Sequence, residues 1–211
     1  GTQWSDIDGD GYGDNASGYP ADSFPNEPSQ WADSDGDGYG DNIFGFEGDR
    51  FPYDPTQWSD YDGDGYGDNQ FGNAPDAFPF DSSQWSDIDG DGEGDNYTYT
   101  VEHTTGLRTQ NGDAFINDAS QWSDIDGDGY GDNLNGSNPD LYPQNPLQHE
   151  DSDGDGIGDN YFYNIDQNNG LRVNQIGDAF PDDGTQWSDI DGDGYGDNAS
   201  GNNADWDPDD P

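Results

Sequence analysis

Residues 6–15 read Asp6-Ile-Asp-Gly-Asp-Gly-Tyr-Gly-Asp-Asn15, and this ten-residue loop decides how the rest of the chain is interpreted. The pattern Asp-x-Asp-Gly-Asp-Gly-x-Gly-Asp-Asn occurs seven times, and successive copies are spaced by 27, 27, 27, 37, 27 and 38 residues. A recurring period of this length is typical of a tandem-repeat protein. The period predicts one array over residues 1–211, with repeats 1–27, 28–54, 55–81, 82–118, 119–145, 146–183 and 184–210, and residue 211 beginning the next phase.

The composition excludes an ordinary hydrophobic core. The chain has 211 residues, 49 acidic side chains against three arginines, a net charge of −46, and only 26 Leu, Ile, Val and Phe residues. Such a chain is either disordered or folded by something other than apolar burial. Disulfides are excluded because there is no cysteine, so a bound cation is the remaining candidate. The charge also argues against nucleic acid as a partner, and no apolar run is long enough for membrane insertion.

The loop has the ligand chemistry of a calcium site. Calcium takes six to eight oxygen ligands, and aspartates at loop positions 1, 3, 5 and 9 can converge on one ion. We expect the glycines at positions 4, 6 and 8 to adopt positive φ angles, which lets the backbone curl round the ion. Position 7 can offer its backbone carbonyl. These are the first nine positions of an EF-hand-type loop, but position 12, where that loop has a glutamate, never carries a carboxylate here.

A second aspartate is predicted to complete each site. It follows the first loop aspartate by 16 residues, or follows an insertion in the fourth and sixth repeats, and we call it the closing aspartate. We expect at least one Ca²⁺ per repeat, about seven or more in all. The predicted ligands at positions 1, 3, 5, 7 and 9 with the closing aspartate are, loop by loop, Asp6, Asp8, Asp10, Tyr12, Asp14 and Asp22; Asp33, Asp35, Asp37, Tyr39, Asp41 and Asp49; Asp60, Asp62, Asp64, Tyr66, Asp68 and Asp76; Asp87, Asp89, Asp91, Glu93, Asp95 and Asp113; Asp124, Asp126, Asp128, Tyr130, Asp132 and Asp140; Asp151, Asp153, Asp155, Ile157, Asp159 and Asp178; Asp189, Asp191, Asp193, Tyr195, Asp197 and Asp205.

Other residues recur with the same phase. A glutamine lies three residues before each loop, and the next residue is Trp in six repeats and His149 in the other. An acid six residues before most loops, such as Asp54, serves either a neighbouring ion or only the solvated surface. The aromatic residues are expected to pack as a small cluster between repeats. The insertions, residues 97–108 and 161–173, place aromatic and β-branched residues on either side of a Gly-containing turn and predict short β-hairpins.

The loops resemble those of thrombospondin type 3 repeats. The matching residues are the Asp-x-Asp-Gly-Asp-Gly-x-Gly-Asp-Asn loop and a following Pro-Asp, as at Pro139 and Asp140. The resemblance implies calcium wrapped by irregular backbone, in extracellular proteins. This chain lacks the cysteines that commonly follow the loop in that family, so packing between repeats is not carried over. Dockerin-type loops need flanking helices, and the nine-residue period of RTX repeats is absent.

The fold class expected from the sequence is irregular, with little regular secondary structure: a calcium-stabilised tandem-repeat solenoid or rod with short β-hairpins in two repeats. The expected function is a structural, extracellular or cell-surface calcium-binding protein, stiffened into a rod or fibre, and either self-associating end to end or part of a longer parent chain. Alternatives are an adhesion or glycan-binding module with exposed Trp, and a mineral-binding matrix. No enzyme activity is expected, because the two histidines lie in no recognisable catalytic arrangement. Glycan candidates are Asn135, Asn15, Asn96 and Asn198.

Overall fold

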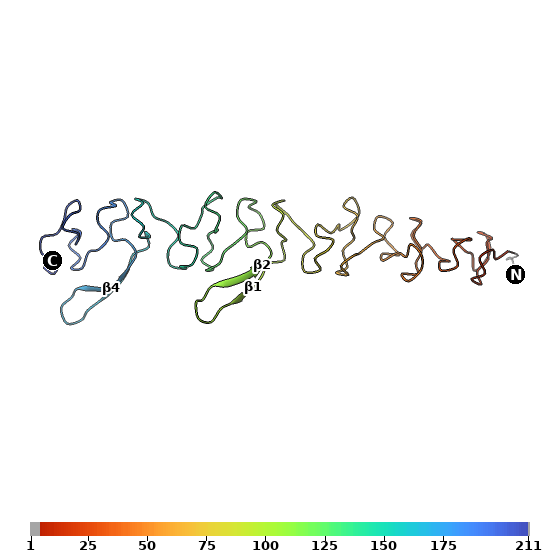
Figure 1. Cartoon of the computed structure of the whole chain (residues 1–211), viewed down its shortest axis with the longest axis horizontal. Helices are drawn as coiled ribbons and strands as arrows, with labels where there is room; N and C mark the ends of the chain where they lie inside the picture. The colour runs from red at the N-terminus through yellow and green to blue at the C-terminus, as the bar shows by residue number, and fades with distance from the viewer. Residues whose placement is uncertain (1–4, 211) are drawn as a thin grey trace. The chain divides into compact units, whose positions relative to one another are not determined.

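The computed structural model describes residues 5–210, which form two compact units. The first unit consists of Gly1–Ile88 with Gly94–Asn96, and the second consists of Asp89–Glu93 with Tyr97–Pro211. The division therefore falls inside the fourth loop. Each unit is a succession of irregular loops along the chain (Figure 1).

Regular secondary structure is confined to two hairpins in the second unit. Strand β1, Thr98–Val101, pairs antiparallel with β2, Arg108–Asn111, so that Val101 lies opposite Arg108. None of the described residues belongs to a helix, and no membrane-spanning helix is found among them. The expectation of an irregular fold with short hairpins is confirmed. The turn of this hairpin includes residues 103–105, and the second strand begins at Arg108, the last residue of the predicted insertion.

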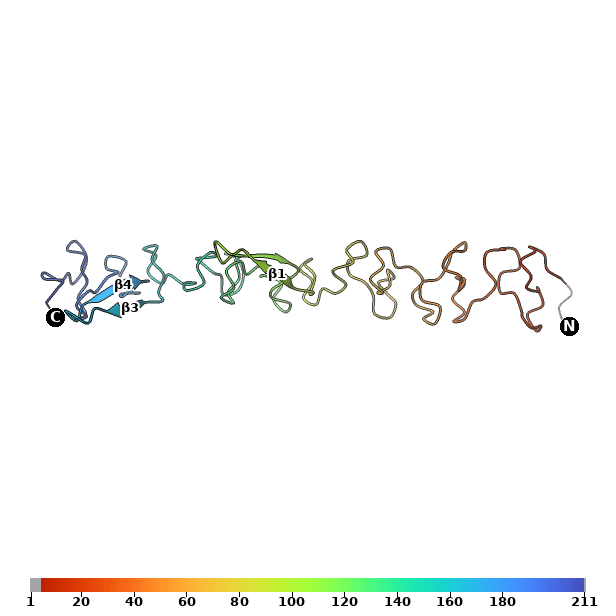
Figure 2. The same ribbon diagram turned by 90° about the horizontal axis from the view of Figure 1, so that it is seen from below.

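The second hairpin repeats the first with one irregularity. Strand β3, Phe162–Ile165, pairs antiparallel with β4, Arg172–Ile176, and a register shift lies between Phe162 and Asn164. Figure 2 shows β3 and β4 side by side. Every residue of β1 and β3 is exposed, so neither hairpin covers an apolar core. Each instead projects from the loops of its own unit (Figure 1).

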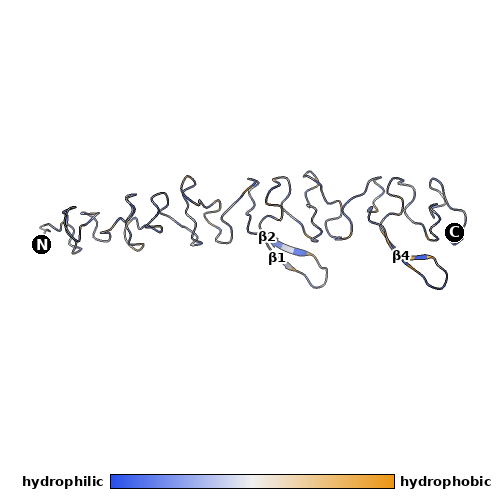
Figure 3. Cartoon of the chain, turned by 180° about the vertical axis from the view of Figure 1, so that it is seen from behind, coloured by the Kyte–Doolittle hydropathy of each residue, from blue (hydrophilic) through white to orange (hydrophobic). Residues whose placement is uncertain are grey.

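The interior of this protein is polar. No hydrophobic residue among those described is fully buried, whereas glutamines and aspartates are. Figure 3 colours the chain by hydropathy: hydrophobic stretches of the chain are short and are separated by hydrophilic ones. Buried polar groups are tolerated when they are hydrogen-bonded or bind an ion. The fold therefore depends on how these glutamines and aspartates are satisfied.

In the second to seventh repeats, the glutamine before the loop is satisfied by its own repeat. The Nε2 group of Gln57 donates to the carbonyls of Asn69, at 3.0 Å, and Asn73, at 2.9 Å, and its Oε1 accepts from the Asn69 amide at 2.9 Å. Gln57 is 1% exposed. We call these residues the anchor glutamines, and the buried ones are Gln30, Gln57, Gln84, Gln121, Gln148 and Gln186. Each ties the two ends of its loop together.

The anchor glutamine also explains the glycine at loop position 8. Gly63 and Gly65, at positions 4 and 6, have φ angles of 84° and 96°, as expected. Gly67, at position 8, does not have a positive φ, so that part of the expectation is wrong. A Cβ atom on Gly67 would lie 2.1 Å from the Gln57 side chain. Position 8 is glycine because the buried glutamine leaves no space for a side chain.

The substitution Gly67→Ala is therefore expected to destabilise the first unit by about 1–3 kcal/mol, as overpacked interiors do. The matched control is Gly184→Ala, because a Cβ there meets its nearest neighbours at 3.5 Å and the φ angle is not positive. Denaturant unfolding in saturating calcium measures both variants. Equal stability of the two variants would contradict the assigned role of Gln57.

The first, second, third and fifth repeats are each joined to the next repeat by aromatic stacking and one backbone hydrogen bond. Tyr39, at loop position 7, stacks on Trp58 of the next repeat, with ring centroids 5.0 Å apart and planes within 3°. The Arg50 amide donates to the Trp58 carbonyl at 3.1 Å. The equivalent stacks are Tyr12–Trp31, Tyr66–Trp85 and Tyr130–His149. The aromatic residues thus meet in pairs between repeats, but they remain partly exposed and form no buried cluster in residues 5–210.

Candidate metal centres

Three aspartates of each loop use one oxygen to fold the loop itself. In the second loop, Asp33 Oδ1 accepts from the Gly36 amide at 2.7 Å, and Asp35 Oδ1 accepts from the Asp37 amide at 3.2 Å. Asp37 Oδ1 accepts from the Tyr39 amide at 2.8 Å. Aspartate readily forms such local turns with backbone amides two or three residues ahead. These turns fix the orientation of each carboxylate. The second oxygens of Asp35 and Asp37, the Oδ2 atoms, accept no hydrogen bond from the backbone.

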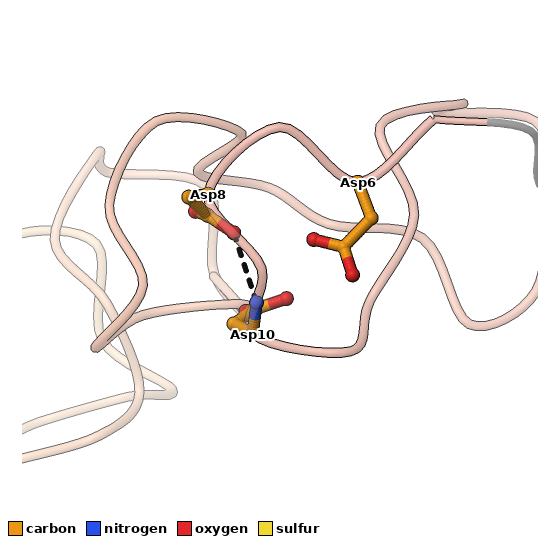
Figure 4. Close-up of side chains that lie close together, drawn as sticks. All are labelled: Asp6, Asp8 and Asp10. Atoms are coloured by element: carbon orange, nitrogen blue, oxygen red, sulfur yellow. Dashed lines mark hydrogen bonds between the residues drawn. The ribbon is translucent and has the colours of Figure 1, made fainter.

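The carboxylates at loop positions 1, 3 and 5 lie close together. In the first loop, one oxygen each from Asp6, Asp8 and Asp10 lie within 4.8 Å of one another. Figure 4 shows these three carboxylates facing the space that the loop encloses. Two oxygens that bind the same calcium ion lie no more than about 5 Å apart. The equivalent groups in other loops that lie within a single unit are Asp33, Asp35 and Asp37; Asp60, Asp62 and Asp64; and Asp124, Asp126 and Asp128.

The closing aspartate is brought to the same place by the backbone. The Asp49 amide donates to the carbonyl of Gly40, at loop position 8, at 2.7 Å. Asp49 is 1% exposed. Burial raises the pKa of its carboxyl group to about 6, and the negative charges of Asp37 and Asp35 contribute to this rise. The same raised pKa of about 6 is found for Asp178, the closing aspartate of the sixth repeat.

A sharp turn just before the closing aspartate directs it back to the loop. Ala74 and Asn138, each two residues before a closing aspartate, have φ angles of 41° and 44°. Left-handed conformations are uncommon outside glycine and cluster at functional sites. In the repeats with hairpins the turn is made by Gly112 and Gly177 instead, both at a φ of 79°. The inserted hairpins thus end in a turn that returns the chain to the loop.

The strongest sign of a cation site is a set of buried oxygens that no protein group satisfies. In the second loop these are the Oδ2 atoms of Asp35, Asp37 and the closing Asp49. Buried carboxylate oxygens without a partner are costly, so each such atom needs an explanation. The same three positions have unpartnered Oδ2 atoms in five loops: Asp8, Asp10 and Asp22; Asp35, Asp37 and Asp49; Asp62, Asp64 and Asp76; Asp126, Asp128 and Asp140; Asp153, Asp155 and Asp178. The oxygen-only donor set fits a hard divalent cation.

The aspartate at position 9 has an additional role. Asp41 accepts from the Ser34 amide at 2.9 Å and from the Ser34 hydroxyl at 2.6 Å, so it fastens position 2 of its loop. Its backbone amide donates to the Ala32 carbonyl at 2.9 Å. Metal ligation by position 9, and by the carbonyl at position 7, stays a prediction.

The acid that lies six residues before the loops belongs to a turn. Asp54 accepts from the Thr56 hydroxyl at 2.6 Å and from the Thr56 amide at 3.0 Å. The hydroxyl bond is the main reason that the pKa of Asp54 is lowered. Its carbonyl accepts from the amide of the anchor Gln57 at 3.0 Å. Asp54 therefore positions the glutamine, and its role follows from this turn.

The fourth loop contains the division between the two units, so its ligation stays a prediction. The closing Asp113 of that repeat is 1% exposed, like its equivalents.

Sequence reasoning missed the anchor glutamines as structural elements, although their sevenfold recurrence was the signal that could have found them. It also missed the contacts that the hairpin arginines make.

No protein-family model, no curated protein sequence and no solved structure was found to match this chain.

Proposed function

We propose that this chain is a calcium-binding structural repeat protein in which ions take the place of a hydrophobic core. The observation that carries the proposal is the triplet of buried, unpartnered Oδ2 atoms at positions 3 and 5 and on the closing aspartate. One divalent cation bound by these oxygens removes both their repulsion and their unsatisfied state. Because the arrangement recurs, the expected content is at least one ion per repeat.

Calcium is the cation that best fits the donor set. All the converging ligands are carboxylate oxygens, whereas zinc, copper and nickel sites in proteins use histidine or cysteine. Magnesium needs a near-ideal octahedron and keeps several waters, while calcium accepts six to eight oxygens in flexible geometry. A loop that offers three aspartates, a closing aspartate and backbone carbonyls suits calcium.

The resemblance to thrombospondin type 3 repeats supports an extracellular location and a structural role. Calcium is abundant outside cells, which suits weak to moderate sites of this kind. Stacking between consecutive repeats, as between Tyr39 and Trp58, supports the proposal that bound calcium stiffens the array. The extended proposal is a calcium-stiffened extracellular rod or fibre, assembled end to end or within a longer chain.

A glycan-binding role for the recurring Trp residues is less well supported. Trp31, Trp58 and Trp85 each stack on a tyrosine of the preceding repeat, so one face of each ring is already used. These contacts favour a structural role for the tryptophans.

Among the four glycan candidates, Asn135 is the best placed. Asn96 and Asn198 donate through Nδ2 to the carbonyls of Ser83 and Thr185, at 2.7 and 2.8 Å, so a glycan there would break a structural bond. Asn135 lies exposed in its loop. We propose Asn135 as the residue that carries a glycan if the chain is glycosylated.

Asp76→Asn tests the calcium proposal, because this substitution replaces a charged closing oxygen by an amide in the third repeat. The expected result is the loss of one bound calcium, or a fall of at least tenfold in the affinity of that site, measured by isothermal titration calorimetry. Asp81→Asn is the matched control, since Asp81 is exposed and accepts from the Ser83 hydroxyl at 2.6 Å in a turn outside the loop. A wild-type protein that binds no calcium, or equal binding by both variants, would reject the proposed ligand set.

A further inference from the structure

The two hairpins place an arginine on the first ligand of the next loop. Arg108, at the start of β2, lies 3.2 Å from Asp124 Oδ2, and Arg172, at the start of β4, lies 2.8 Å from Asp189 Oδ2. Asp124 and Asp189 are the position 1 aspartates of the fifth and seventh loops. Among residues 5–210, these are the two arginine–carboxylate ion pairs.

The arginines replace a bond that other loops make internally. In the second and third loops, the Oδ2 atom of position 1 accepts from the glycine amide at position 6, as Asp33 does from Gly38 and Asp60 from Gly65, both at 3.2 Å. In the fifth loop, Asp124 Oδ2 accepts instead from Arg108. We call the fifth and seventh loops the covered loops. In each of them the position 1 carboxylate thus forms an ion pair with a hairpin arginine.

Further hydrogen bonds between each hairpin and the following loop support the contact between the arginine and the aspartate. The Arg108 amide donates to the Ile125 carbonyl at 2.6 Å, and the Arg172 amide donates to the Ile190 carbonyl at the same distance. Gln110, two residues further along β2, donates to the Trp122 carbonyl at 3.0 Å and accepts from the Asp124 amide at 3.1 Å. Each hairpin is therefore fastened to the following loop through its backbone as well as its side chain.

The guanidinium groups also cover the loop. A Cβ on Gly127, at position 4 of the fifth loop, would lie 2.2 Å from Arg108, whereas a Cβ on Gly36 or Gly63 would meet nothing within 4 Å. Asp124 and Asp126 are buried, at 6% and 8% exposure, and Asp189 is buried at 5%. Arg108 and Arg172 themselves are 22% and 20% exposed at the side chain.

We infer that Arg108 and Arg172 make the fifth and seventh loops the weaker calcium sites of the array, which fill last. A guanidinium beside the carboxylate competes with calcium for its negative charge. At a separation of about 5 Å, the repulsion between a unit charge and a divalent ion corresponds to a roughly tenfold loss of affinity even in water. The chain then carries two classes of site, and its calcium response spans a wider concentration range. This inference rests on the proposed calcium function.

A calcium titration followed by NMR separates the loops. In the wild-type chain, the amide resonances of Gly129 and Gly194, at position 6 of the covered loops, are expected to respond at roughly tenfold higher calcium than those of Gly38 and Gly65. The double variant Arg108→Gln with Arg172→Gln is expected to bring all four glycines to the same calcium range. Arg50→Gln is the matched control, because Arg50 is exposed and belongs to the first unit, whereas both hairpins belong to the second.

A charge-conserving variant keeps the test decisive if the glutamine variant folds poorly. Arg108→Lys with Arg172→Lys is expected to leave Gly129 and Gly194 responding last. The inference is overturned if all glycines respond together in the wild type, or if removing the arginines weakens the covered loops, which would make these residues positioning groups for Asp124 and Asp189. A response of no glycine at any calcium concentration would reject the calcium function itself.

Discussion

Chelation of calcium is expected to abolish the cooperative thermal unfolding of this chain. The buried side chains of the second to seventh repeats include a glutamine and a closing aspartate in each, such as Gln57 and Asp76, and no apolar side chain among residues 5–210 is fully buried. Without a cation, the carboxylates of one loop repel one another by about 1 kcal/mol or more per pair at 4 Å, even in water. Nothing in the described interior offsets that repulsion except the hydrogen bonds of the loop.

The expected size of the effect follows from mass action. Calcium at ten times the dissociation constant stabilises the folded state by about 1.4 kcal/mol per site, and seven such sites give about 10 kcal/mol. This is comparable to the whole stability of a typical domain. Metal binding and folding are thus expected to be one event, as in other small metal-dependent domains.

Circular dichroism and tryptophan fluorescence of one sample before chelation, after chelation and after calcium is restored measure this effect. Trp58 and Trp85 report on folding because each stacks on a tyrosine of the preceding repeat. Magnesium at the same concentration is the control and is expected to restore little structure. A melting temperature that chelation shifts by less than about 5 °C would show that something other than a cation holds the fold.

The stability of the calcium-free chain is expected to fall as the pH rises, and calcium is expected to reverse this slope. Burial, with neighbouring carboxylates, raises the pKa values of Asp49, Asp178 and Asp126 to about 6, from an ordinary value of 3.8. A group with a raised pKa in the folded state favours folding while it is protonated. Its contribution is therefore fully present below pH 3.8 and is lost as the pH rises through about 6.

Calcium is expected to reverse the sign of the pH dependence of stability, because it binds the ionised carboxylates. Protons and calcium compete for Asp49 and Asp178, so the stabilisation by calcium grows as the pH rises over the same window. The folded fraction at fixed temperature, measured by circular dichroism between pH 4 and 7, is expected to diverge steadily between samples with chelator and samples with saturating calcium. Asp49→Asn removes one titrating closing group and is expected to flatten the slope of the chelated sample. Parallel curves in the two conditions would contradict the prediction.

The sequence was sufficient to find the recurring aspartates, because their spacing is fixed by the repeat; their role as ligands stays a prediction. Asp49 and Asp140 both follow the first aspartate of their loop by 16 residues, and the structure buries both. The absence of helices among residues 5–210 and the presence of two hairpins also followed, from glycine and proline content and from the turn within each insertion. Calcium itself stays a proposal, supported by the donor set.

The remaining features depend on contacts that no local pattern encodes. The anchor Gln57 bonds to residues 12 and 16 positions later, so its recurrence was visible but its partners were not. The glycine at position 8 was assigned to backbone freedom, whereas the Gln57 side chain is what excludes a Cβ there. The pairing of Arg108 with Asp124 depends on where β2 starts and on the docking of the hairpin, neither of which a single sequence determines.

The bond between the closing aspartate and the glycine at position 8 is insensitive to the length of chain between them. Asp140 donates to Gly131 at 2.8 Å, and Asp178 donates to Gly158 at the same distance although a whole hairpin intervenes. The chain that leaves the loop is therefore held at the same hydrogen bond, whether or not a hairpin is inserted in it. We therefore expect other inserted segments to be tolerated at this point, because an insertion there leaves the aspartates of the loop and this hydrogen bond in place.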